Sequence, residues 1–125
     1  TQEKGWKYLK GAKKEKRHGR VGFVYNYNEG GMIFPDALDK PSRTIITGEG
    51  GTSPSRFKHV IQDQDGKYRR LTPIELERLN GFPDDWTLTE TMPTNFRYFC
   101  MGNALVVPLV GEIMKGIKKI IPYDP

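Results

Sequence analysis

The fold of this 125-residue chain is decided by the stretch Arg69-Arg70-Leu71-Thr72-Pro73-Ile74-Glu75-Leu76-Glu77-Arg78-Leu79-Asn80-Gly81-Phe82-Pro83-Asp84. Thr72 with Glu75 three residues later forms a capping box, and Pro73 occupies the first helical position, where a missing N–H costs nothing. The sequence therefore predicts a helix over Pro73–Asn80. Gly81 suits the left-handed residue that ends a helix, and a proline two residues later prevents its continuation.

Downstream of this helix, residues 84–95 are predicted to form a loop. The longest helix is then expected over residues 103–121, with Asn103 as its N-cap. One stripe of this helix is apolar, while its lysines fall outside the stripe. Full burial of five such side chains would contribute on the order of 10 kcal/mol, so the stripe must pack on the rest of the chain, on a partner or on a second copy. The stripe consists of Val106, Val110, Ile113, Ile117 and Ile120.

Upstream of the decisive helix, the chain is predicted to be β-rich, irregular and short-stranded. Alternating or β-branched runs indicate strands, and glycines and prolines separate them. A loop rich in Gly and hydroxyl side chains covers residues 48–55. The strands are expected at residues 21–27, 32–34, 44–47 and 57–61.

Basic residues are concentrated in two regions. Residues 1–20 hold eight Lys or Arg against two Glu, and residues 41–70 hold six against three acidic residues, in a chain of net charge +5. Binding to a polyanion is the natural physical interpretation. The alternative for residues 1–20 is a solvated, partly disordered tail, although Trp6 and Tyr8 favour an ordered contact.

Cysteine and hydropathy patterns exclude several classes of protein. The single Cys100 excludes an internal disulfide framework and a cysteine-rich metal site, and the isolated His18 and His59 indicate no metal ligation. No unbroken apolar run approaches the roughly 20 residues that span a bilayer, and no signal-peptide core is present. We therefore expect a cytoplasmic protein with no metal and no membrane contact.

The decisive stretch resembles motif IX of the DNA cytosine-5 methyltransferases of bacterial restriction–modification systems. Its Arg, Thr, Glu, Arg-Leu and Gly-Phe-Pro anchors are all in register. The stretch Gly102-Asn103-Ala104-Leu105-Val106-Val107-Pro108, with Arg97-Tyr98 before it, is similar to motif X of the same family. That resemblance implies that Asn103 and Ala104 help to line a pocket for S-adenosylmethionine, with the N-terminus of the last helix facing the methionine carboxylate. Phe99 and Cys100 depart from the polar or basic residues that many members have there.

The segment Pro41-Ser42-Arg43-Thr44-Ile45-Ile46-Thr47, followed by Ser55-Arg56-Phe57-Lys58-His59, looks like the target-recognition domain of these enzymes. Thr44 matches a threonine that contacts the DNA backbone beside the flipped cytosine. Arginine suits the O6 and N7 edge of guanine, and lysine suits phosphate. The resemblance thus implies that duplex DNA is contacted by Arg43, Thr44, Arg56, Lys58 and Arg69.

The resemblance covers residues 20–121 and implies an α+β fold. It divides the chain into a basic segment (1–20), a β-rich target-recognition region (21–70), a bracing helix and loop (71–100) and a C-terminal helix (101–125) that belongs to a Rossmann-like catalytic domain. The family transfers a methyl group from S-adenosylmethionine to C5 of a flipped cytosine. It uses a Cys after Pro as nucleophile, an acidic residue in Glu-Asn-Val and a Phe-x-Gly-x-Gly cofactor loop, none of which this sequence contains.

Several interpretations stay open at this point. Without a nucleophile, the chain alone is expected to be inactive and to act with a separate catalytic half. A chain that begins with Thr1 suggests an excised C-terminal fragment, and the small subunit of a split methyltransferase is the alternative. A non-catalytic DNA-binding remnant and a related enzyme that acts on transfer RNA are the other candidates.

Overall fold

The computed structural model describes residues 2–121, which mix helices with two small sheets, as an α+β fold requires. The chain forms two compact units, the first from residues 2–41 and 53–70 and the second from residues 42–52 and 71–121. In chain order the elements are α1 (Gln2–Lys10), β1 (Lys13–His18), β2 (Val24–Glu29), β3 (Val60–Gln62), β4 (Tyr68–Arg70), α2 (Pro73–Asn80), α3 (Thr94–Asn103) and α4 (Val107–Ile120).

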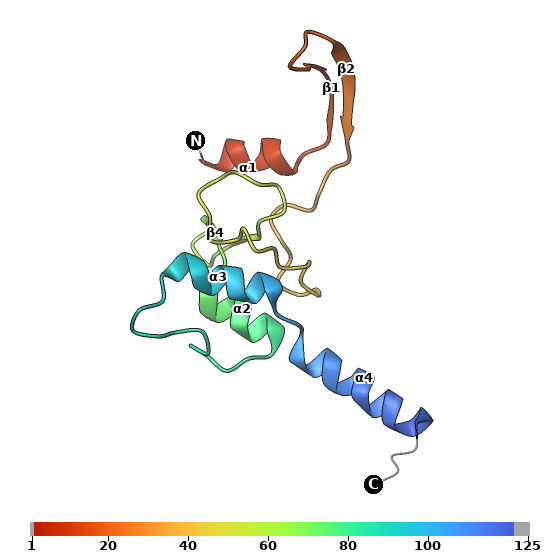
Figure 1. Cartoon of the computed structure of the whole chain (residues 1–125). Coiled ribbons are helices and arrows are strands. Elements are labelled where there is room, and N and C mark those ends of the chain that lie inside the picture. The colour runs from red at the N-terminus through yellow and green to blue at the C-terminus, as the bar shows by residue number, and fades with distance from the viewer. Residues whose placement is uncertain (1, 122–125) are drawn as a thin grey trace. The chain divides into compact units, whose positions relative to one another are not determined.

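The first unit carries a long antiparallel hairpin of β1 and β2, which Figure 1 shows in red and orange. Its register runs from Lys13 opposite Glu29 to His18 opposite Val24. Gly22 at the tip has a φ of 78°, a left-handed conformation that glycine adopts at little cost. Residues 2–18 are therefore ordered as a helix and a strand, so the alternative of a disordered basic tail is wrong.

Buried polar contacts hold the first unit together. The Lys10 Nζ atom lies 2.8 Å from Asp36 Oδ2, which also accepts a hydrogen bond of 2.7 Å from the backbone N–H of Val60. Lys10 and Val60 are completely buried. Because Asp36 satisfies both donors, it joins the end of α1 to the start of β3 without leaving an unpaired buried charge.

In the second unit, the predicted helix α2 is confirmed with both of its caps. The Thr72 side chain accepts from the backbone N–H of Glu75, and the Glu75 carboxylate accepts from the N–H of Thr72. Gly81 has a φ of 78° and donates its N–H to the carbonyl of Arg78. These contacts satisfy backbone groups that helix ends otherwise leave unpaired.

The rest of the second unit differs from the sequence prediction. Residues 94–103 form α3, which was predicted as loop and helix start, and α4 begins only at Val107. α3 packs against α2, and Asn80 donates from Nδ2 to the carbonyl of Met101 at 3.1 Å. Asn103 is the last residue of α3 and not an N-cap, because its side chain donates back to the carbonyl of Phe99 at 3.0 Å.

Several predicted strands are also absent or shorter. Residues 32–34 and 44–47 are not strands, the run predicted over 57–61 forms the three-residue strand β3, and β2 begins three residues later than expected. A β-branched run becomes a strand only where a neighbouring strand pairs with its backbone. Residues 44–47 lack such a partner within the described part of the chain.

One helical stretch meets the length and composition of a membrane span, although the sequence contains no unbroken apolar run of that length. By length and composition alone, Thr94–Ile120 is apolar enough to cross a membrane. The expectation considered only unbroken runs of apolar residues, whereas the mean hydropathy of a stretch stays high when a few polar residues are scattered in it. The stretch is nevertheless two helices interrupted at residues 104–106, and its first half buries the charged Arg97 against α2.

Candidate functional site

A buried ionic cluster ties α3 to α2. The carboxylate of Glu77 is completely buried, and its Oε1 atom accepts from the backbone N–H of Thr87 at 3.0 Å and from its hydroxyl. Arg97 donates to the same oxygen at 3.0 Å and to Asp85 at 2.9 Å. The cluster therefore fixes the motif IX-like helix, the following loop and the motif X-like helix in one arrangement.

The charge on Glu77 is maintained despite its burial. Burial by itself disfavours the ionised carboxylate, but hydrogen bonds from Thr87 and the guanidinium of Arg97 outweigh it, so the pKa of Glu77 lies below its ordinary value of 4.5. The other oxygen, Oε2, has no hydrogen-bond partner among the residues that the structure describes. The Glu77–Arg97 pair is thus structural, because both of its charged groups are buried and only Asp85, at the edge of the cluster, reaches solvent.

The segment that contains Thr44 is held directly against α3. A Cβ atom on Gly102 would lie 2.6 Å from the carbonyl carbon of Ile46 and 2.5 Å from the Cα of Thr47, so only glycine fits there. The Tyr98 hydroxyl donates to the carbonyl of Leu71 at 2.8 Å, which joins α3 to the start of α2. The second unit therefore brings together three segments that are far apart in sequence, namely residues 42–52, α2 and α3.

A second glycine brings α4 close to the end of α2. A Cβ atom on Gly81 would lie 2.8 Å from Cγ of Pro108, in addition to its left-handed backbone. Gly81 and Gly102 belong to the two patterns that carried the resemblance. The structure gives both the same physical reason, which is the close approach of another backbone or ring.

The predicted DNA-contacting residues do not lie in one compact unit. Arg43 and Thr44 are in the second unit, where Thr44 is exposed and Arg43 is half-buried. Arg56, Lys58 and Arg69 are in the first unit.

Of the three candidates in the first unit, Arg56, Lys58 and Arg69, Arg69 alone is exposed. The guanidinium of Arg56 contacts the carboxylate of Glu29 and donates to the carbonyl of Gly30 at 2.5 Å. Lys58 is 3% exposed. In this conformation Arg56 and Lys58 are occupied by the protein itself.

The predicted cofactor-side residues lie at the break between α3 and α4. Asn103 is exposed, and its Oδ1 atom has no partner among the described residues, whereas Ala104 is half-buried. α4 begins three residues later, with Val106 at the N-cap position and Pro108 in the first turn. The free helix N-terminus expected at Asn103 is therefore displaced to Val107.

Cys100 on α3 is half-buried. In residues 2–121 no group of three or more His, Cys, Asp or Glu side chains could hold a metal ion.

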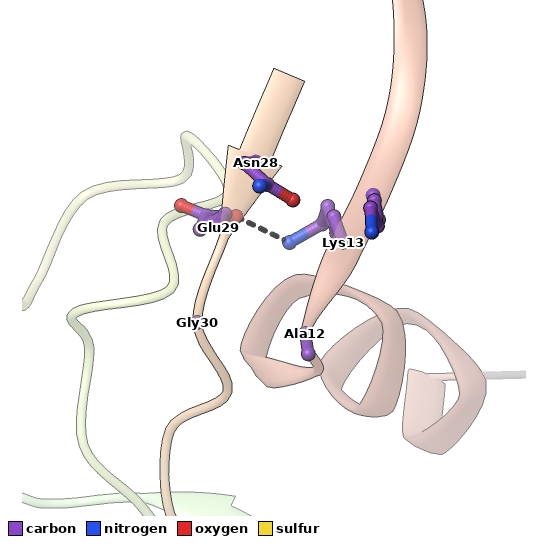
Figure 2. Close-up of a pocket in the computed structure, with 6 residues that line it drawn as sticks. Ala12, Lys13, Asn28, Glu29 and Gly30 are labelled. Atoms are coloured by element: carbon purple, nitrogen blue, oxygen red, sulfur yellow. Dashed lines mark hydrogen bonds and ion pairs between the residues drawn. The ribbon is translucent and has the colours of Figure 1, made fainter. Parts of the chain in front are cut away.

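Sequence reasoning missed the exposed side of the β1–β2 hairpin. Figure 2 shows the base of the hairpin, where a hollow of about 470 Å³ is bordered by both strands and Lys13 reaches across to Glu29. Lys14 and Asn28 line the same hollow. The available signal was the period of two in residues 13–18, which places Glu15 on the same side of a strand as Lys13 and Arg17 and leaves Lys14 and Lys16 together on the other side. A count of net charge does not use this order.

Comparison with known proteins gives one consistent result. Residues 1–119 match the family model of C-5 cytosine-specific DNA methylases. The chain is 55% identical over 115 residues to the type II methyltransferase M.Sau3AI of Staphylococcus aureus, covering 92% of this chain and 27% of that protein. It is 36% identical over 81 residues to M.Bsp6I of a Bacillus species, covering 63% of this chain and 23% of that protein.

A DNA (cytosine-5)-methyltransferase of Dictyostelium discoideum is 32% identical over 101 residues, which is 68% of this chain and 26% of that protein. The chain thus spans about a quarter of the length of the curated relatives it matches. No solved structure matches it.

Proposed function

This chain belongs to the family of C-5 cytosine-specific DNA methylases, and we propose that it is the DNA-recognition and C-terminal part of such an enzyme. In this proposal the nucleophilic cysteine lies in a separate catalytic half, because the one cysteine of this chain follows Phe99 and not a proline. The whole enzyme would act in the cytoplasm as the modification partner of a restriction system, on cytosine in duplex DNA.

One observation carries the proposal beyond family membership. The segment with Thr44 packs on α3 at Gly102, where only glycine fits, and the Tyr98 hydroxyl of α3 donates to the carbonyl of Leu71 just before α2. A recognition segment braced in this way presents Thr44 on the surface of a rigid support. Such rigidity suits a residue that must hold the DNA backbone beside an extruded base.

The residues proposed to contact DNA would act unequally. Thr44 and Arg69 lie on the surface, so neither would need to leave a buried position to contact DNA. Arg56 would first have to leave the Glu29 carboxylate, and Lys58 would have to leave a buried position. Arg43, next to Thr44 in the second unit, is half-buried and is proposed to contact a phosphate or a guanine.

The residues at the α3–α4 break fit one wall of a cofactor site. S-adenosylmethionine would supply the methyl group. The exposed amide of Asn103 offers an unpartnered Oδ1 atom to a polar group, and the half-buried Ala104 offers an apolar contact beside it. These two residues would orient one side of the cofactor, and the remaining contacts would come from the catalytic half.

Helix α4 is proposed to dock on that catalytic half. No α4 residue is buried by the described part of the chain, and its apolar stripe leaves Ile113 53% exposed and Ile117 40% exposed. An apolar stripe of this kind marks an interaction surface. The catalytic half is the natural occupant because the relatives contain roughly three-quarters of their length outside the matched region.

A chimera tests the proposal. The matched region of the Staphylococcus aureus relative is replaced by this chain, the chimera is expressed in cells without their own cytosine methylation, and host DNA is read by bisulfite sequencing. We expect methylated cytosines in a defined sequence context. A soluble, folded chimera that leaves all cytosines unmodified would refute the proposal and favour a non-catalytic remnant.

Matched substitutions test the docking surface in the same chimera. Ile113→Asp would bury an unpaired carboxylate at the junction, which is costly, and is expected to abolish methylation. Lys118→Asp places the same carboxylate on the polar side of α4 and should preserve methylation. Equal activity of the two variants would show that α4 docks elsewhere or not at all.

A further inference from the structure

The two faces of the β1–β2 hairpin differ sharply in how their charges are paired. On one face, Lys13 lies 2.7 Å from Glu29, and Arg17 lies 2.8 Å from Glu15. The Arg17 guanidinium also stacks 3.6 Å from the centre of the Tyr27 ring. We call this the paired face, because each of its lysine and arginine side chains has a carboxylate partner.

The opposite face carries cations and amides without partners. Lys14 is directly opposite Asn28, and Lys16 is directly opposite Asn26, so all four side chains project from the same side of the ribbon. All four are exposed, and none of these side chains makes a hydrogen bond or ion pair within residues 2–121. We call this set of Lys14, Lys16, Asn26 and Asn28 the open face.

The composition of the open face is unusual for a strand surface that only contacts water. Asparagine is depleted in strands, yet β2 places Asn26 and Asn28 at two successive positions of one face. Lys14 and Lys16 are neighbours on that face with no acidic residue beside them, so their mutual repulsion is uncompensated. Ammonium groups beside amides that both donate and accept hydrogen bonds are complementary to phosphates beside base edges.

We propose that the open face enters the major groove of duplex DNA, with Lys14 and Lys16 on phosphates and Asn26 and Asn28 on base edges. This inference rests on the proposed function and adds a sequence-reading element to it. The major groove, about 12 Å wide, admits a two-stranded ribbon. Asparagine suits the N6 and N7 edge of adenine, to which it forms two hydrogen bonds.

The spacing of the hairpin fits the spacing of the bases. Residues two apart on one strand are separated by about 6.8 Å, and base pairs are separated by about 3.4 Å along the helix axis. The Lys14–Asn28 and Lys16–Asn26 pairs therefore lie two base-pair steps apart. The paired face keeps the ribbon rigid through the Lys13–Glu29 contact, which Figure 2 shows at its base.

The lysines are tested by the salt dependence of binding. Anisotropy of a fluorescent duplex is measured with the full chain at increasing salt for the wild type, for Lys14→Gln/Lys16→Gln and for the control Lys118→Gln/Lys119→Gln. The control removes the same charge from the polar side of α4. We expect the log–log salt slope to fall by about 2 in the hairpin variant, close to 0.9 per phosphate contact, and to stay unchanged in the control.

The asparagines are tested by sequence selection. The chain and the variants Asn26→Ala/Asn28→Ala and Asn95→Ala each select duplexes from a random pool, and bound sequences are read out. We expect the hairpin variant to keep its salt slope but to relax its preference by roughly ten-fold at one or two base pairs. The Asn95 control, exposed on α3, should select the wild-type sequence.

The outcomes separate this inference from the proposed function. A chain that binds no duplex DNA contradicts both. If the chain binds DNA but the hairpin lysine variant has the same salt slope as its control, the inference alone is overturned. If the hairpin asparagine variant selects the same sequence as Asn95→Ala, the amides do not read bases. The inference would also be overturned if the hairpin variants lost as much affinity for duplex RNA as for duplex DNA, because the deep major groove of RNA admits no ribbon.

Discussion

Replacing Glu77 with glutamine should be among the most costly single changes in the second unit, and the reason lies in the pairing of Arg97. The carboxylate is completely buried, accepts two hydrogen bonds from Thr87 and forms the ion pair with Arg97. Glutamine keeps an acceptor near the Oε1 position but removes the charge. Its NH₂ group would also replace Oε2, where no described residue accepts a hydrogen bond.

The size of the effect follows from what Arg97 retains. Removing one partner of a buried ion pair typically costs about 3–5 kcal/mol. Arg97 keeps its contact with Asp85, whose side chain is 46% exposed, so we expect a smaller loss of stability than this, about 2–3 kcal/mol. Arg97→Met leaves the buried carboxylate without a cation and should cost about 3–5 kcal/mol.

The assay is urea unfolding of the full chain, followed by the fluorescence of Trp86. This tryptophan lies 6.1 Å from the ring of Phe82 in the second unit, and a Trp6→Phe background removes the signal of the first unit. With a denaturant slope of about 1–3 kcal/mol per molar, the midpoint should fall by roughly 1–2 M. The control is Arg78→Gln, the adjacent residue, whose exposed ion pair with Asp84 should contribute little.

The same change should alter the pH dependence of stability. Because the pKa of Glu77 is depressed in the folded state, its stabilisation is complete above the ordinary value of 4.5 and is lost as pH falls through the folded value. The difference between wild type and Glu77→Gln should therefore be largest at neutral pH and shrink in acid. A Glu77→Gln midpoint no lower than that of Arg78→Gln, or a difference that grows in acid, would refute the reasoning.

Two further substitutions test the local geometry of the second unit with the same assay. Thr72→Ala removes the acceptor of the capping-box hydrogen bond from the N–H of Glu75 and should cost about 0.5–2 kcal/mol. The comparison is Thr91→Ala at an exposed loop position, which should leave the midpoint nearly unchanged. Gly102→Ala forces a methyl group against the backbone of Ile46 and Thr47 and should cost about 1–3 kcal/mol. The control is Gly111→Ala, whose added Cβ would have no atom within 4 Å, so the midpoint should not fall. Comparable losses of stability in Gly102→Ala and Gly111→Ala would contradict the packing argument.

The parts of the fold that could be predicted are those that local chemistry determines. The helix α2 was located to the residue because its capping box, its first-turn proline and its final glycine lie within ten residues of one another. α3 was missed because its signal is tertiary. Its buried Arg97 is unfavourable in any helix taken alone and becomes favourable only beside Glu77, 20 residues earlier.

The candidate site shows the same division between local and distant causes. A count of charges identified residues 1–20 as basic, but it could not separate Lys13 from Lys14. That separation depends on Glu29, which reaches Lys13 only because the hairpin register places it opposite. Likewise, Arg56 was predicted to be available to DNA, and the same Glu29 occupies it.

The apolar stripe of α4 is where local and tertiary evidence disagree most. The sequence requires five apolar side chains to be covered, yet the structure leaves Val110 37% exposed and Ile113 53% exposed, with no α4 residue buried. Exposing such an apolar stripe to water is unfavourable, and the solvated side of the helix is the polar one, which carries the exposed ion pair of Glu112 and Lys115. The proposed docking of α4 on a separate catalytic half would provide cover for this stripe, in line with its exposure here.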